Sequence, residues 1–192
     1  MKRVCVFSGS RPGSREVYAE GARALGAELV RQGIGLVYGG ASVGLMGVVA
    51  DAVLRAKGEV VGVLPKVLVD REVAHLELTK LHLVGSMHER KQLMSELSDG
   101  FIAMPGGYGT LDELFEILTW AQLGIHAKPI ALFDVAGFWG PLGALLEHMV
   151  SEGFIPEDQL GLLMKDADPS ALLAKMKAWT PPALGPKWAP KA

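Results

Sequence analysis

The feature that most constrains the fold is a recurring order of segments along the chain. A short apolar run comes first, a loop containing glycine or proline follows, and a segment with helical periodicity comes next. The apolar runs predict strands at 3–7, 35–38, 59–64, 80–84, 100–104 and 129–133. The periodic segments, the first of them capped by Ser14, predict helices at 15–31, 44–57, 87–97, 110–123, 138–152 and 169–179.

Most of the predicted strands are apolar without interruption, as strands covered on both faces are. Strands that alternate with helices indicate a parallel sheet between two layers of helices. We therefore predict an α/β fold in three layers, with helices on both faces of a doubly wound parallel sheet. Such sheets bind ligands at the carboxyl ends of their strands, so a site is expected in the loops that follow residues 7, 38, 84 and 104.

The length of 192 residues fits one domain, predicted at 1–180, followed by a proline-rich tail at 181–192. The net charge of −2 lacks the basic excess of a protein that binds nucleic acid. The stretch 33–50 is uncharged, but its six glycines favour a strand, a loop and a helix start over a membrane span. A single cysteine, Cys5, suits a reducing compartment. We expect a cytoplasmic protein with neither a nucleic-acid nor a membrane partner.

Two loops are rich in glycine, and each lies between a predicted strand and a predicted helix. The loop at 39–47 reads GGASVGLMG, and the loop at 105–110 reads PGGYGT. Glycine lets the backbone approach a ligand closely, and a helix start offers N–H groups to an anion. The alternative is that both loops are only tight turns.

The pyrophosphate of NAD is not the expected anion. The turn after the first strand, 8–13, lacks G-x-G-x-x-G spacing, and no acidic residue ends the second strand. Neither glycine loop leads into the Gly-Lys-Ser/Thr of a nucleoside triphosphate site. The five histidines lack metal-site spacing, and no G-x-S-x-G elbow is present. These patterns favour a mononucleotide or a sugar phosphate, with no metal and no cofactor.

Arg90 lies on an otherwise apolar face of its predicted helix, together with Met87, Met94 and Leu97. A charge that faces the core needs a partner, and a guanidinium suits a phosphate or a carboxylate. The alternative is that the arginine stem covers apolar surface while its head reaches water. The spacing does not distinguish the two.

Glu113 also allows two interpretations. Thr110 and Glu113 match the Ser/Thr-x-x-Glu capping box, in which the glutamate only satisfies a backbone N–H. A first-turn carboxylate beside a phosphate loop is equally well placed to act on a bound nucleotide, and the helix N-terminus favours its ionised form.

The stretch 105–113, PGGYGTLDE, is similar to the P-G-G-x-G-T-x-x-E signature of the LONELY GUY family of cytokinin-activating phosphoribohydrolases. Many members once carried the label of lysine decarboxylase. Further blocks resemble the family at 7–10, 38–47, 87–91 and 119–124, within a resemblance that covers about 3–155. Decarboxylation itself is not expected, because a pyridoxal enzyme needs a Schiff-base lysine and a cofactor pocket.

The resemblance implies a Rossmann-like homodimer that cleaves the N-glycosidic bond of a nucleoside 5′-monophosphate. The products would be ribose 5-phosphate and a purine base such as adenine or an N6-substituted adenine. The catalytic pair would be Arg90 and Glu113, and residues 106–110 would cradle the phosphate. The implied substrate contacts are Ser8, Gly9, Gly39, Gly40, Glu72, Met87, Lys91, Gly106, Gly107, Tyr108, Gly109, Thr110, Leu111, Asp112 and Thr119. The alternative is a non-catalytic nucleotide-binding protein, a carrier or a sensor, on the same scaffold.

The chain departs from the family pattern at three positions. Ala41 replaces the usual third glycine, Ser8 stands where a cysteine is common, and Asp112 replaces the first of two adjacent glutamates. Ala41 matters if the backbone there needs a positive φ. Asp112 keeps the charge with a shorter reach, and neither member of the implied catalytic pair is changed.

Overall fold

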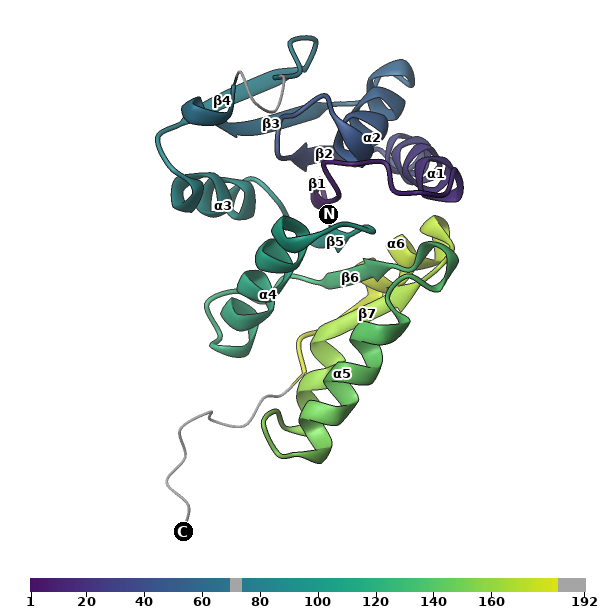
Figure 1. Ribbon diagram of the computed structural model, residues 1–192, viewed down its shortest axis with the longest axis vertical. Coiled ribbons are helices and arrows are strands. Elements are labelled where there is room, and N and C mark those ends of the chain that lie inside the picture. The colour runs from purple at the N-terminus through teal and green to yellow at the C-terminus, as the bar shows by residue number, and fades with distance from the viewer. Residues whose placement is uncertain (70–73, 183–192) are drawn as a thin grey trace.

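The computed structural model describes residues 1–69 and 74–182, which form a parallel sheet flanked by helices (Figure 1). Within this part of the chain, seven strands lie in the order β4-β3-β2-β1-β5-β6-β7, and all neighbours are parallel. The strands are β1 (Arg3–Phe7), β2 (Gly35–Tyr38), β3 (Val60–Pro65), β4 (Lys80–Val84), β5 (Phe101–Ala103), β6 (Ile130–Phe133) and β7 (Leu163–Asp166). This arrangement confirms the predicted α/β class with a doubly wound parallel sheet.

Helices cover both faces of the sheet. Figure 1 shows α1 and α2 on one side and α3 and α4 on the other. The α-helices are α1 (Val17–Arg31), α2 (Gly44–Arg55), α3 (Met87–Glu96), α4 (Tyr108–Gln122), α5 (Gly140–Ser151) and α6 (Pro169–Ala178). Short 3₁₀ turns are η1 (Lys66–Leu68), η2 (Val135–Gly137) and η3 (Glu157–Leu162).

The central strand β1 contributes to two hydrophobic cores. Val4 and Val6 pack with residues of α1, α2 and α6, whereas Cys5 and Phe7 pack with residues of α3 and α4. Successive side chains of a strand point to opposite faces, and all four are buried here. Positions of a strand that are covered on both sides are apolar, which explains the apolar run at 4–7.

The direction in which strands are added reverses between β1 and β5. The chain first adds β2, β3 and β4 on one side of β1, and then adds β5, β6 and β7 on the other. Sheets of this type carry a crevice at such a point, outside the carboxyl ends of the two central strands. The loops after β1 and β5 meet there, since the Gly9 N–H donates to the Pro105 carbonyl at 3.1 Å.

Some expectations differ from the structure. Residues 163–166 were not predicted as a strand, yet they form β7 and pair with β6. Helix α1 begins at Val17 with Glu16 as its N-cap, so the prediction of Ser14 as the cap is wrong. Glu72 and most of the predicted tail lie outside the described residues. None of the described helices is long and apolar enough to span a membrane.

Candidate active site

The loop after β5 enters α4 through Gly107, the N-cap of that helix. Packing requires glycine at 106, because a Cβ there would lie 2.1 Å from the Thr110 Oγ1 atom. At Gly107 and Gly109 a Cβ would meet no atom within 4 Å, and neither residue has a positive φ. Neither packing nor backbone strain therefore explains these two glycines. The backbone at both positions is open at the start of α4, as an anion site there would require.

The capping-box interpretation of Thr110 and Glu113 is wrong. Helix α4 begins at Tyr108, so Thr110 already lies in its first turn and Glu113 in its second. Thr110 is buried, and its side chain packs against Gly106. Glu113 is therefore not the N3 partner of an N-cap residue. The first N–H groups of α4, which have no partner within the helix, are therefore contributed by residues of the glycine loop.

A cavity of about 540 Å³ opens where the loops after β1 and β5 meet. Its walls combine glycine backbone with aromatic rings, and Arg11 brings a positive charge. The lining residues are Gly9, Ser10, Arg11, Pro12, Gly13, Tyr18, Leu45, Pro105, Gly106, Gly107, Tyr108 and Phe138. Arg11 was not among the predicted site residues. The available signal was a basic residue in the turn that directly follows the first strand.

Arg90 extends from α3 to the carboxyl ends of β2 and β3. Its Nε donates to the Val63 carbonyl at 3.1 Å, and its Nη2 donates to the Gly39 carbonyl at 2.9 Å. The residue is 4% exposed, so its head does not extend into water, and the alternative of a surface-covering stem is wrong. A Cβ on Gly39 would lie 2.0 Å from Nη2, so the glycine makes room for the guanidinium.

Glu113 and Arg90 both act electrostatically on the thiol of Cys5. Burial raises the pKa of Cys5 well above its ordinary value, the Glu113 carboxylate raises it further, and the Arg90 guanidinium opposes the rise. Cys5 lies in β1 between Val37 of β2 and Phe101 of β5. A carboxylate and a cation thus approach the same central strand, near the point where the strand order reverses. Neither residue lines the glycine-loop cavity itself.

Lys91 joins α3 to α4 through two carboxylates. Its Nζ atom lies 3.2 Å from the Asp112 Oδ2 atom and 3.0 Å from the Glu116 Oε1 atom. Burial lowers the pKa of Lys91, but hydrogen bonds to Glu116 and Asp112 outweigh this effect and raise it above its ordinary value. Glu116 was not among the predicted site residues. Its place three residues after Glu113, on the same side of a helix, was the available signal.

Three buried side-chain oxygens of the described residues lack a hydrogen-bond partner: the Ser8 Oγ, the Tyr38 hydroxyl and the Glu116 Oε2 atoms. Ser8 immediately follows β1 and is 7% exposed. Buried polar atoms are normally satisfied by protein, water or a ligand. Water or a ligand is what normally satisfies such oxygens when the protein itself does not.

The Ala41 departure causes no strain in the loop after β2. The positive φ falls on Gly40, at +81°, and Ala41 is not among the described residues with a positive φ. Ala41 is buried and forms an isolated antiparallel bridge with Ala74. The other predicted contacts at Met87 and Tyr108 are open to solvent, with 41% and 94% of their surface exposed.

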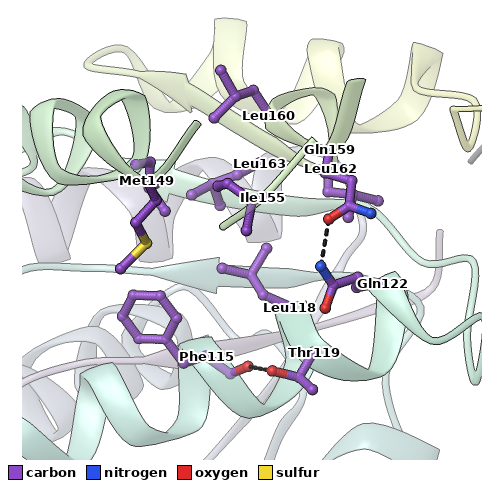
Figure 2. Close-up of a pocket in the computed structure, with 11 residues that line it drawn as sticks. Phe115, Leu118, Thr119, Gln122, Met149, Ile155, Gln159, Leu160, Leu162 and Leu163 are labelled. Atoms are coloured by element: carbon purple, nitrogen blue, oxygen red, sulfur yellow. Dashed lines mark hydrogen bonds between the residues drawn. The ribbon is translucent and has the colours of Figure 1, made fainter. Parts of the chain in front are cut away.

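A second cavity, of about 230 Å³, separates α4 from α5 and η3 (Figure 2). Thr119 lies on its α4 wall and donates from Oγ1 to the Phe115 carbonyl at 2.7 Å. The other lining residues are mostly apolar: Phe115, Leu118, Gln122, Leu146, Met149, Ile155, Gln159, Leu160, Leu162 and Leu163. Arg90 and Glu113 do not line it. Thr119 is thus apart from the glycine-loop cavity. It also lines a separate pocket of about 480 Å³ on α4, together with the predicted contacts Leu111 and Asp112.

Comparisons with known proteins agree on one family. A family model described as possible lysine decarboxylase matches residues 46–176. A cytokinin riboside 5′-monophosphate phosphoribohydrolase from Oryza sativa subsp. japonica is 47% identical over 180 residues, covering 94% of this chain and 74% of its own. A protein of the same description from Arabidopsis thaliana is 46% identical over 180 residues, covering 94% and 79%.

Solved structures show how widely this fold is shared. The molybdenum cofactor binding protein from Rippkaea orientalis is 21% identical, has a TM-score of 0.70, and the match covers 93% of this chain and 97% of that one. That similarity extends to the fold alone. The family model and the two phosphoribohydrolases go further, and by them the chain belongs to the LONELY GUY family, as its 105–113 signature predicted.

Proposed function

We propose that this protein hydrolyses the N-glycosidic bond of purine nucleoside 5′-monophosphates, giving a free base and ribose 5-phosphate. The observation that carries this proposal is the identity of 46–47% to two named phosphoribohydrolases over 94% of the chain. AMP and cytokinin riboside 5′-monophosphates are the expected substrates. A cytoplasmic location is part of the proposal, because the single cysteine is buried and unpaired.

In this proposal the 5′-phosphate binds at the N-terminus of α4. Gly107 and Gly109 leave the backbone accessible there, and the dipole of the helix favours an anion. Arg11 adds a positive charge from the facing loop. Binding energy from the phosphate, which does not react, then orients the bond that is cleaved.

Arg90 and Glu113 act on the reacting end of the nucleotide. Cleavage of a glycosidic bond leaves positive charge on the sugar. The Glu113 carboxylate stabilises that charge and positions or activates the attacking water. Arg90 anchors the nucleotide and helps the departing base to accept a proton. The remaining proposed contacts are Ser8, Gly9, Gly39, Gly40, Glu72, Met87, Lys91, Leu111, Asp112 and Thr119.

The second candidate is a carrier that binds a nucleotide without cleaving it. The fold match to a protein named for binding the molybdenum cofactor favours this candidate. A match at 21% identity supports a shared scaffold, and a scaffold does not determine function. The phosphoribohydrolases share more than twice that identity, so the hydrolase is the better-supported function.

Release of adenine from AMP tests the proposal. The wild-type protein should release adenine, and Glu113→Gln should keep its fold and bind AMP while turnover falls about 100-fold or more. Glu20→Gln, the same change at an exposed site on α1, serves as the matched control and should equal the wild type. If the wild type binds AMP but releases no adenine, the protein is a carrier and the proposed hydrolase function is wrong. Wild-type turnover in Glu113→Gln would show that Glu113 is not catalytic.

A homodimer formed through α5 and its neighbours is a further part of the proposal. Helix α5 carries several leucines, yet none of its residues is buried. Leu145, Ile125 and Phe154 are 45%, 64% and 80% exposed. Exposed apolar surface of this kind marks an interaction site, and a second copy of the chain is the proposed occupant.

A further inference from the structure

His75 connects the first glycine loop to α2. The residue is 7% exposed. Its main-chain N–H donates to the Gly40 carbonyl at 3.0 Å. On the ring, the Nε2 atom lies 3.0 Å from the Asp51 Oδ1 atom, and the Nδ1 atom lies 3.4 Å from the Glu77 nitrogen. His75 therefore links a loop, a helix and the segment that leads to β4.

These contacts define which ring nitrogen carries the hydrogen. A backbone N–H can only donate, so the Nδ1 of His75 accepts from Glu77. The Nε2 atom then carries the hydrogen and donates it to Asp51. Both ring nitrogens thus have a hydrogen-bond partner, and Asp51 orients the ring from a side chain that is 51% exposed. These contacts alone would describe a core histidine with a purely structural role. The loop backbone that His75 binds, however, also binds Arg90.

Two groups hold adjacent peptides of the loop after β2. The Arg90 Nη2 atom donates to the Gly39 carbonyl at 2.9 Å, and the His75 N–H donates to the next carbonyl, that of Gly40. The residue after that, Ala41, forms a bridge with Ala74, the neighbour of His75. The segment at 74–75 therefore fixes the turn that receives the guanidinium.

We propose that Asp51 and His75 form a positioning pair for Arg90. Asp51 orients the His75 ring, His75 fixes the Gly40 peptide, and this peptide sets where the Gly39 carbonyl receives the guanidinium. Neither residue of the pair lines the glycine-loop cavity. The inference rests on the proposed catalytic role of Arg90. Neither His75 nor Asp51 is part of the P-G-G-x-G-T-x-x-E signature.

Four variants test the pair by steady-state release of adenine from AMP. Asp51→Ala and His75→Leu should each lower kcat about 10-fold to 100-fold, because a shift of about 1 Å in a positioned group has effects of this size. The KM for AMP should rise by a smaller factor than kcat falls, since the phosphate is held elsewhere, on α4. His75→Gln, whose amide nitrogen can still donate to Asp51, should recover most of the loss. The double variant Asp51→Ala/His75→Leu should be no worse than His75→Leu alone.

A stability control separates positioning from general destabilisation. Leu172→Ala removes a fully buried side chain on α6 and should lower the Tm while leaving kcat unchanged. If His75→Leu fails to fold, Asp51→Ala and His75→Gln still decide the question, because Asp51 is half exposed. Wild-type kcat in Asp51→Ala, or a His75→Gln variant as slow as His75→Leu, overturns the inference.

Arg90→Lys distinguishes failure of this inference from failure of the proposed function. If Arg90→Lys retains wild-type turnover, the catalytic role of Arg90 fails, and the positioning pair fails with it. If Arg90→Lys is inactive while Asp51→Ala and His75→Leu turn over at the wild-type rate, the positioning pair alone is wrong.

Discussion

Alanine at position 39 would place a methyl group in the space that the Arg90 guanidinium occupies. The added Cβ would lie 2.0 Å from Nη2 and 3.1 Å from Cζ of Arg90. An ordinary contact begins near 3.4 Å, so the guanidinium must withdraw by the difference, about 1.4 Å. A misplacement of about 1 Å costs about 100-fold in rate. We therefore expect Gly39→Ala to lower kcat for AMP about 100-fold, equivalent to about 2.7 kcal/mol of transition-state stabilisation.

Gly39→Ala also weakens the hydrogen bond from the Arg90 Nη2 atom to the carbonyl of residue 39. A hydrogen bond to a charged group contributes about 1.5–3 kcal/mol, so the Tm should fall as well. Adenine release at saturating AMP measures kcat, and a thermal melt measures stability. Gly161→Ala is the matched control, because its Cβ meets no atom within 4 Å and its φ is not positive. A folded Gly39→Ala protein with kcat within about threefold of the wild type would refute the reasoning, since the guanidinium would then not need its observed position.

Three further expectations follow from other contacts. Gly107→Ala should raise the KM for AMP about 10-fold or more, because its Cβ fills space that the phosphate would occupy and meets no protein atom within 4 Å. An unchanged KM would show that the phosphate does not bind at this loop. Leu145→Glu should convert the proposed dimer to monomer in size-exclusion chromatography with light scattering, whereas a wild-type monomer would contradict the proposed interface. Hydrogen bonds from Arg3 lower the pKa of Glu59 in the folded protein, so this stabilisation is present at neutral pH and is lost as pH falls through the folded-state pKa. The Tm of Glu59→Gln should therefore fall less than the Tm of the wild type between about pH 6 and pH 3. Equal falls would show that Glu59 does not carry this pH dependence.

The central strands could be predicted because burial on both faces leaves a local trace. Every residue of β2 and β3 is buried, so an apolar run is required at both. Strand β7 left no such trace, since it has four residues at the sheet edge and ends in Lys165 and Asp166. Its pairing with β6, about 30 residues earlier in the chain, decides its conformation.

The candidate site also depends on contacts between residues that are far apart in the sequence. Helical spacing could place Arg90 on an apolar face, but its acceptors are backbone oxygens of Val63 and Gly39, 27 and 51 residues away. Their positions follow from the order of the strands, which no local pattern contains. The start of α4 was misplaced because Thr110 and Glu113 fit a capping box, whereas a glycine N-cap such as Gly107 leaves no side-chain signal.

The burial of Cys5 gives this protein an internal reporter of opening. The residue has no exposed surface, and its strand is enclosed by β2 and β5 at the centre of the sheet. A thiol reagent can reach it only when the sheet separates, so the modification rate at fixed reagent measures the free energy of that event. Because the sequence contains one cysteine, the labelling signal has one source. The folded population of each variant can thereby be measured in the assay sample itself, and a loss of turnover can be corrected for it without an added probe.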